Sequence, residues 1–190
     1  MRRLCAAAAL FFVLTACLYL CIASFAFNPN VYSQEPPFDR MAQETAAYLR
    51  GNQAALSPEL FGEQERQHMA DVLGLFRFGR RTAFFLGALG ALCICAGWRE
   101  KRYFWIGAAV FTGLTGALAV WAALDFTGWF TAMHRMAFSN DLWLFDASSP
   151  LIQMMPESFF VSAAELIGGR LLTCVCGAFL FGFLCKGKKA

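Results

Sequence analysis

The chain has 190 residues, of which 58% are hydrophobic and 15% are charged. This apolar content is typical of a protein with several membrane spans and argues against a soluble domain, whose surface needs more charge. The net charge of +3 is small and the basic residues form no continuous stripe, so nucleic acid is not an expected partner. We expect a single integral membrane domain over residues 1–190.

An uncharged run over residues 4–27 follows Arg2 and Arg3. A helix of this length can cross the roughly 30 Å hydrocarbon core of a bilayer, so we predict the first span here. A cleaved lipoprotein signal is the alternative, because Leu14-Thr15-Ala16-Cys17 resembles a lipobox. The run stays apolar to Phe27, well past that cysteine, which favours a retained span.

Residues 28–81 are mostly polar and predict a small region outside the membrane. Ser57-Pro58 has the pattern of a helix N-terminus, with a cap residue followed by proline. Further along, an apolar stripe at helical spacing predicts a short surface helix that carries His68; its residues are Met69, Val72, Leu73 and Phe76. A straight helix would lift His68 about 20 Å above Thr82, so we expect a break at Gly74 or Gly79.

Three further spans are predicted over residues 82–98, 103–124 and 159–185. Within the third span of the four, Gly113 and Gly116 are the expected packing surface, since small residues let membrane helices approach closely. The expected fold is therefore an all-α membrane protein with four transmembrane helices. The connections over residues 28–81 and 125–158 would form a small extracytoplasmic cap.

Basic residues predict the orientation of these spans. Two lie at the N-terminus, three in the turn over residues 99–102 and three after residue 185, and the positive-inside rule places all three segments in the cytoplasm. The basic cluster of Arg77, Arg80 and Arg81 opposes this orientation but is outnumbered. We thus predict a protein of the bacterial cytoplasmic membrane, with cytoplasmic termini and a site at the extracytoplasmic face.

All eight cysteines fall inside apolar runs, so we expect no disulfides. The pairs Cys93/Cys95 and Cys174/Cys176 have one intervening residue and no nearby histidine or carboxylate, which is a poor pattern for a metal site. No metal and no cofactor is expected. Motifs of soluble hydrolases and of nucleotide-binding enzymes are also missing from the sequence.

His68 and His134 are the only histidines, and the predicted topology places them on the same membrane face. Each has carboxylates within reach: Asp71 lies three residues after His68, and Asp141 and Asp146 follow His134. A catalytic pair is one interpretation. Two hydrogen-bonded interfacial residues without a catalytic role are the other.

Arg170 is the second unusual feature, because a charge inside the fourth run is costly unless it is paired or faces a polar cavity. It could pair with Glu165 or with Asp125. It could instead hold an ester or headgroup oxygen of a lipid.

Two segments of the chain resemble the bacterial lipoprotein intramolecular transacylase (Lit) family. They are His68-Met69-Ala70-Asp71-Val72 and the stretch over residues 134–146, which begins His134-Arg135-Met136 and is followed by Leu151-Ile152 and Pro156-Glu157-Ser158. The four-span arrangement with two external regions is also similar. The chain departs from the family pattern at Ala147-Ser148-Ser149-Pro150, where a proline and a further aspartate are expected.

This resemblance implies an enzyme that moves the sn-2 acyl chain of a diacylglyceryl-cysteine onto the α-amine of the same cysteine, giving a lyso-form lipoprotein. It implies that His68 and His134 are the catalytic residues, and that a diacylated lipoprotein and membrane lipid are the partners. In such a site Asp71 would orient His68, Asn140 or Arg135 would hold the oxyanion, and Trp143 would lie at the headgroup level.

Asp146 and Arg170 are further candidate substrate contacts. Two other hypotheses remain open at this point: a haem or redox protein with His68 and His134 as axial ligands, and a membrane scaffold without catalytic activity.

Overall fold

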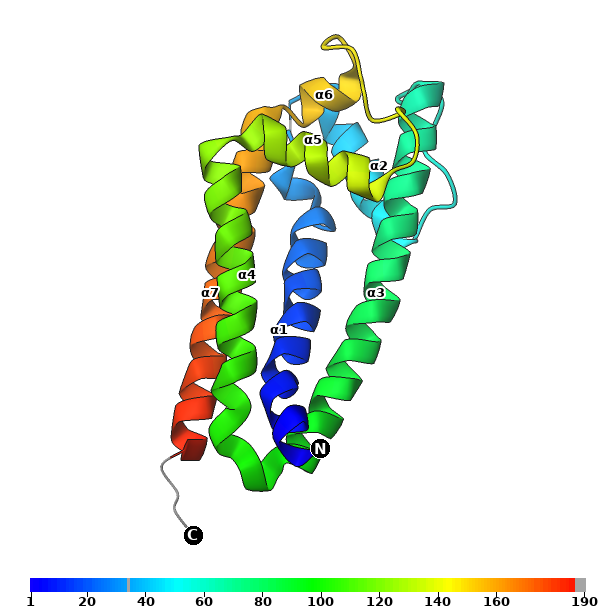
Figure 1. Ribbon diagram of the computed structural model, residues 1–190. Coiled ribbons are helices and arrows are strands. Elements are labelled where there is room, and N and C mark those ends of the chain that lie inside the picture. The colour runs from blue at the N-terminus through cyan, green and yellow to red at the C-terminus, as the bar shows by residue number, and fades with distance from the viewer. Residues whose placement is uncertain (34, 187–190) are drawn as a thin grey trace. The chain divides into compact units, whose positions relative to one another are not determined.

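The structure is a computed structural model that describes residues 1–33 and 35–186 (Figure 1). Within these residues every regular element is helical, so the all-α class is confirmed. In chain order the elements are α1 (Arg2–Ala26), η1 (Pro29–Val31), α2 (Phe38–Arg50), α3 (Glu63–Gly97), η2 (Trp98–Tyr103), α4 (Phe104–Leu124), α5 (Phe126–Ala137), α6 (Pro150–Met154) and α7 (Glu157–Lys186). Lys188 and Lys189, which support the predicted orientation, lie outside the described residues.

The chain divides into two compact units, each made of segments that are distant in the sequence. Unit 1 comprises Met1–Cys21, Gly79–Phe130 and the chain from Gly168 onward. Unit 2 comprises Ile22–Phe78 and Thr131–Ile167. Helices α1, α3, α5 and α7 contribute residues to both units.

Among the described residues, three stretches are long and apolar enough to cross a membrane: 2–26, 63–124 and 157–184. The middle stretch contains α3, η2 and α4, and so includes the predicted spans over residues 82–98 and 103–124. The four-span count remains a prediction.

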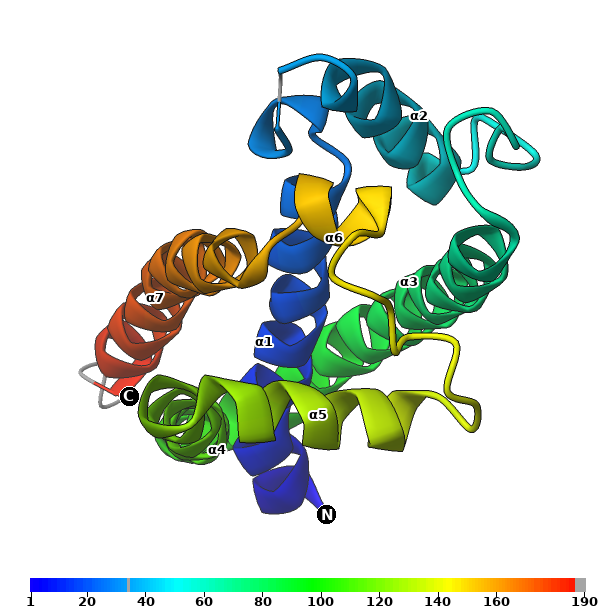
Figure 2. The same cartoon turned by 90° about the horizontal axis from the view of Figure 1, so that it is seen from above.

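In unit 1 the helices α1, α3, α4 and α7 run side by side. Seen from above, α1 lies between α7 and α3 (Figure 2). The contact between α1 and α4 is tight enough that a Cβ atom at Gly107 would lie 2.5 Å from the carbonyl oxygen of Ala7. The prediction that Gly113 and Gly116 form the packing surface of this helix is wrong, since a Cβ atom at either would meet no described atom within 4 Å. The buried face of α4 lies toward its beginning instead, where small and aromatic residues alternate at helical spacing: Phe104, Gly107, Ala108 and Phe111.

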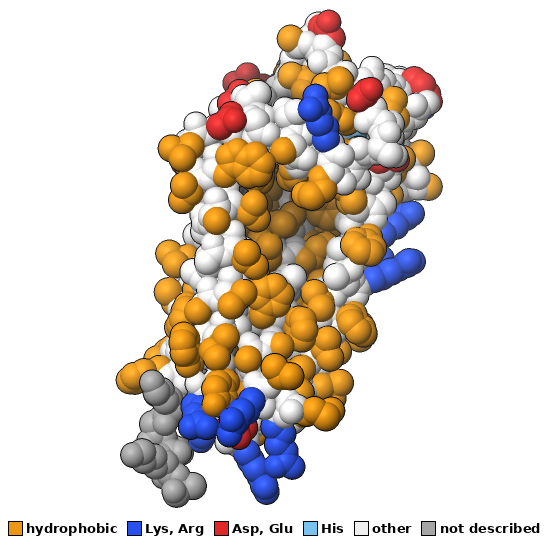
Figure 3. Space-filling model, viewed as in Figure 1, with side chains coloured by type: hydrophobic (Ala, Val, Ile, Leu, Met, Phe, Trp, Pro, Cys, Tyr) orange, Lys and Arg blue, Asp and Glu red, His pale blue; other side chains and the backbone are white. Residues whose placement is uncertain are grey.

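The outside of unit 1 is apolar, as expected of helices that face lipid. Side chains such as Phe84, Leu92 and Leu114 are more than half exposed. The space-filling view shows apolar side chains over these helices, with Lys and Arg side chains at the lower end of the view and a few more on its right flank and near its top (Figure 3). Glu100 forms ion pairs with Arg3 (3.5 Å) and Arg102 (3.7 Å), so the N-terminus and the turn over residues 98–103 lie together.

Unit 2 has its own hydrophobic core, built around α2. One face of α2 is buried against α3 and α6, where Met69, Leu73 and Leu151 contribute. Gly51 ends α2 with a φ of 86°, a left-handed conformation that glycine adopts without strain. This core positions the beginning of α3 and therefore His68.

Two expectations about helix boundaries are wrong. Helix α3 is continuous from Glu63 to Gly97 and has no break at Gly74 or Gly79, because its two halves are held by the separate cores of the two units. Ser57-Pro58 does not begin a helix. The amide and hydroxyl groups of Ser57 donate to the carboxylate of Glu44 instead, which fixes the loop beside α2.

Candidate active site

The two histidines lie close together in unit 2. His68 is in the second turn of α3 and His134 is in the last turn of α5. Their ring centroids are 6.3 Å apart, and the ring planes are inclined by 26°. The proximity expected from the predicted topology is therefore confirmed.

Aromatic side chains surround this histidine pair. Phe138 contacts both rings, with centroids 5.0 Å from His68 and 5.6 Å from His134. Phe145 packs edge-on against His68 at 5.4 Å, and Trp143 lies 5.1 Å from His134. His68 is consequently only 6% exposed, while His134 is half-buried.

The pKa of His68 is lowered from 6.5 to about 4; burial is the largest cause, the nearby His134 contributes to the lowering, and Asp71 acts in the opposite direction. His68 is therefore neutral at pH 7. Its buried Nδ1 atom has no hydrogen-bond partner among the described residues. An unpaired buried polar atom costs about 1–3 kcal/mol, a penalty that is accepted most readily where a ligand or a proton will use the atom.

The segment over residues 138–149 links α5 to α6 and lies along one face of the beginning of α3 (Figure 2). Gln64 donates to the carbonyl oxygens of Leu142 and Leu144, each at 3.0 Å. The side-chain amide of Asn140 donates to Asp71 at 2.9 Å, and Asp71 lies one helical turn after His68 on α3. These contacts hold the aromatic residues of the segment against the histidines.

Of the supporting residues expected from the sequence, the structure brings Asp71, Asn140 and Trp143 to the histidine pair. Asp71 is engaged by Asn140, and the side-chain oxygen of Asn140 also accepts from the amide of Leu142 at 3.1 Å. Orientation of His68 by Asp71 and an oxyanion contact from Asn140 stay predictions.

The remaining predicted residues are Arg135, Asp146 and Arg170. Arg135 is exposed on α5, beside His134 in sequence. Asp146 accepts hydrogen bonds from the amide and hydroxyl of Ser148, which lower its pKa, and among the described contacts it meets neither histidine. Arg170 is exposed on α7 and belongs to unit 1.

Sequence reasoning missed Glu65, whose buried carboxylate anchors the end of the segment, and the individual contributions of Phe138 and Phe145. Glu65 had a recognisable signal. It lies three residues after Gly62, the spacing of a capping box, in which a carboxylate returns to the amide just before a helix. Phe138 and Phe145 had no such signal, because the chain contains 21 phenylalanines and nothing in the sequence separates these two from the rest.

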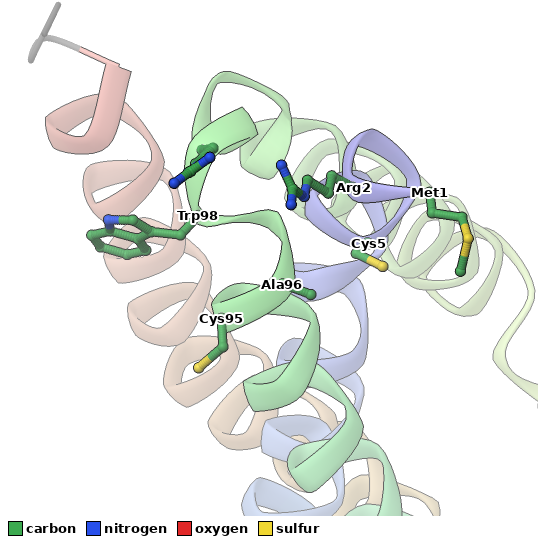
Figure 4. Close-up of a pocket in the computed structure, with 7 residues that line it drawn as sticks. Met1, Arg2, Cys5, Cys95, Ala96 and Trp98 are labelled. Carbon is green, nitrogen blue, oxygen red and sulfur yellow. The ribbon is translucent and has the colours of Figure 1, made fainter.

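A pocket in unit 1 lies between the ends of α1 and α3 (Figure 4). Apolar and cationic residues line it, among them Arg2, Cys5 and Trp98, and its lining contains neither histidine nor carboxylate. The histidine pair therefore remains the candidate site.

Fold and site together define a membrane-integral helical protein with a histidine pair among aromatic side chains. The sequence model of the lipoprotein intramolecular transacylase Lit matches residues 3–160, and the chain belongs to this family. It is therefore an enzyme, a membrane transacylase that acts on lipoproteins. A search of curated proteins gives no match.

Solved structures of the Lit transacylase from Bacillus cereus have the same fold. One is 21% identical, with a TM-score of 0.74 over 98% of this chain and 96% of the other. Two carry a histidine replaced by arginine or by alanine; each is 22% identical, with a TM-score of 0.71 over 98% of this chain and 91% or 92% of the other. The membrane-integral character and bacterial origin of the family agree with the apolar helices described above.

The family assignment rules out a scaffold without catalytic activity. The geometry also speaks against a haem held between the two rings. A planar macrocycle must extend on all sides of its axial ligands, whereas Phe138 packs against both His68 and His134 and closes one side of the gap.

Proposed function

We propose that this transacylase moves the sn-2 acyl chain of a diacylglyceryl-cysteine to the α-amine of the same cysteine, with His68 and His134 as its acid–base pair. The product is a lyso-form lipoprotein. The observation that carries the proposal is the 6.3 Å separation of the only two histidines in a shielded aromatic surrounding. In this proposal one bound substrate meets a ring nitrogen of each histidine, at ordinary hydrogen-bond distances of about 2.7–3.2 Å.

The reaction needs a proton to move from nitrogen to oxygen. The neutral α-amine attacks the ester carbonyl, the C–N bond forms and the nitrogen becomes acidic. His68, neutral because of its low pKa, accepts this proton. The C–O bond to glycerol then breaks, and the His68 imidazolium returns the proton to the leaving oxygen, so atoms and charge balance.

His134 supplies the second part of the chemistry. It is more exposed than His68 and lies across the gap, where its N–H can donate to the oxyanion that forms on the carbonyl. Trp143 packs against its ring and limits the ring's motion. Arg135, exposed beside His134 in the chain, is proposed to contact the phosphates or carbonyls of surrounding lipid.

No serine or cysteine nucleophile is needed, because the amine and the ester belong to one molecule. Effective molarities of well-oriented intramolecular reactions reach about 10⁵ M or more, so holding the substrate folded supplies much of the rate. The diacylated form of the substrate is part of this proposal. Asp146 and Arg170 stay candidate contacts for its peptide and lipid portions.

The proposed topology has four spans, both termini in the cytoplasm and the histidine pair at the outer face. Its support is the positive-inside rule, together with the ion pair of Arg3 and Glu100 and the pocket that Arg2 and Arg99 both line, which bring the N-terminus to the turn over residues 99–102. A site at the outer face would meet the lipoprotein's lipid anchor at headgroup depth.

The test is mass spectrometry of a diacylated lipopeptide incubated with the purified protein. Total mass does not change, so fragmentation must locate the acyl chain on the amine. We expect His68→Ala and His134→Ala each to lower the rate by about 10²-fold or more, the usual contribution of a general acid or base. Gln67→Ala is the matched control, because Gln67 is exposed beside His68 and its side chain donates to Glu63, away from the histidine pair.

Full activity in the double histidine variant would disprove the two-histidine mechanism. If the acyl chain stays on glycerol with the intact enzyme, the proposed acyl transfer itself is wrong.

A further inference from the structure

Glu65 is a buried carboxylate one helical turn before His68, with only 4% of its surface exposed. Its Oε2 atom accepts from the amide of Gly62 at 2.8 Å, and its Oε1 atom accepts from the amide of Leu151 at 3.0 Å and from the hydroxyl of Ser149. No lysine or arginine in the described part of the chain forms an ion pair with it. A buried carboxylate held by three donors and no cation is expensive to keep unless its position matters.

The donors of Glu65 come from the starts of two helices. Gly62 immediately precedes α3, and Leu151 is the second residue of α6. The free amide groups at both helix starts therefore converge on one carboxylate, which satisfies donors that the helices themselves leave unpaired. Glu65 thereby joins α6 directly to the turn of α3 that precedes His68.

This junction fixes the far end of the segment over residues 138–149. Asn140 fastens the near end to Asp71, and Gln64 fastens the middle through Leu142 and Leu144. Glu65 holds the point where the segment enters α6 by hydrogen bonds, and the buried side chains of Leu151 and Met154 add core contacts to the same helix. If that point is released, the aromatic residues that shield the histidine pair are held at the near end and middle alone.

We infer that Glu65 is a positioning residue of the transacylase site: by anchoring the start of α6 and Ser149 to α3, it fixes the aromatic wall of the segment 138–149 against His68 and His134. The inference rests on the proposed function of the histidine pair. It assigns Glu65 no contact with substrate and no proton in the reaction. Glu65 affects the rate of acyl transfer through the positions of the residues around the histidine pair.

Glu44 offers a matched control within the same unit. Its carboxylate also takes three donors, from the side chain of Gln53 and from the amide and hydroxyl of Ser57, and these lie on the loop after α2. Removal of Glu44 should thus cost similar stability while leaving the histidine pair untouched. Comparing the two sites separates a positioning role from a general loss of stability.

The experiment measures thermal midpoint and kcat for acyl transfer in detergent, well below every midpoint, for Glu65→Ala, Glu65→Gln and Glu44→Ala. We expect Glu65→Ala to lower kcat on the order of 10²-fold, the loss that follows when reacting groups shift by about 1 Å. Glu65→Gln keeps a carbonyl oxygen for Leu151 and should recover most of that loss. Glu44→Ala should keep wild-type kcat.

Ser149→Ala removes a single donor and keeps the test decisive if Glu65→Ala does not fold; it should lower kcat several-fold. Wild-type kcat in folded Glu65→Ala, or an equal loss in Glu44→Ala, would overturn the inference. The double histidine variant is run in parallel. If it is inactive while Glu65→Ala is fully active, only the positioning role fails; if it is active, the proposed mechanism fails.

Discussion

At the scale of single residues, the decisive property is the neutrality of His68. Its burial among Phe138 and Phe145 outweighs the favourable charge of Asp71, so the imidazole stays unprotonated far below its ordinary titration range. A base of such low pKa is weak, and its conjugate acid is strong. In the proposed mechanism, neutral His68 takes the proton from the attacking nitrogen, and its imidazolium is a strong acid toward the leaving oxygen.

The pKa of His68 should respond to its neighbours with opposite signs. His134→Ala removes a cation that opposes protonation, so the pKa should rise from about 4 toward 6.5; Asp71→Asn removes a favourable anion, so the pKa should fall. Titration of the two histidines by NMR in micelles, assigned with single variants, measures both. A wild-type His68 that titrates at its ordinary value, or shifts of equal sign, would contradict this account.

Stability should depend on pH through the same residue. An unfolded histidine titrates near 6.5 and folded His68 near 4, so between these values the unfolded chain binds more protons. Stability contributed by neutral His68 is therefore present above pH 6.5 and is lost as the pH falls toward 4. The thermal midpoint of the wild type should drop more steeply over this window than that of His68→Ala, and equal slopes would refute the assignment.

At the scale of elements, helix α3 connects the two units without interruption. Glycine in a helix costs about 1 kcal/mol relative to alanine, and α3 tolerates this cost at Gly74 because Met69 and Leu73 anchor the helix in the core of unit 2. Gly74 and Gly79 therefore do not break helix α3.

Two glycines of α3 give a paired prediction. A Cβ atom at Gly74 meets no described atom within 4 Å, so Gly74→Ala should raise stability by up to about 1 kcal/mol. A Cβ atom at Gly79 would lie 2.8 Å from ring carbons of Tyr19, so Gly79→Ala should lower stability. Thermal unfolding in detergent compares the two, and a lower midpoint for Gly74→Ala would show that α3 needs its flexibility there.

The hydrogen bond between Asn140 and Asp71 gives the second prediction at this scale. A double-mutant cycle with Asp71→Ala and Asn140→Ala should show a coupling energy of about 0.5–1.5 kcal/mol, the net contribution of an ordinary protein hydrogen bond. The pair Asn140 and Gln67, which share no bond, should show additive effects. A coupling energy near zero for Asp71 and Asn140 would mean that their hydrogen bond does not hold the segment over residues 138–149 against α3.

At the scale of the whole molecule, the proposed topology can be tested in the bacterial membrane. A periplasmic reporter such as alkaline phosphatase should be active when fused after Ser148, and green fluorescent protein should fluoresce when fused at the C-terminus. Both outcomes follow from cytoplasmic basic segments flanking four spans. If alkaline phosphatase is active when fused at the turn over residues 99–102, that turn is outside the cytoplasm and the predicted orientation is wrong.

Much of this molecule could be predicted from its sequence. Uncharged runs identified the apolar helices, and the positions of the polar regions led to the expectation that His68 and His134 meet. The boundaries failed where tertiary packing decides them: α3 begins at Glu63 because Glu65 caps it, not at Ser57-Pro58.

Helix α2 and the anchoring role of Glu65 could not be predicted, since both depend on partners distant in the sequence. Ser149 and Leu151, which bind Glu65, lie more than 80 residues further along the chain.

That separation has a consequence for how the enzyme comes into being. His68 is synthesised early, and its partner His134 follows only after α4 and most of α5 have been made. Each unit likewise draws on both halves of the chain. A nascent or truncated chain that stops at the turn over residues 98–103 thus carries one histidine and lacks the later residues that complete both cores, so we predict that it has no transacylase activity.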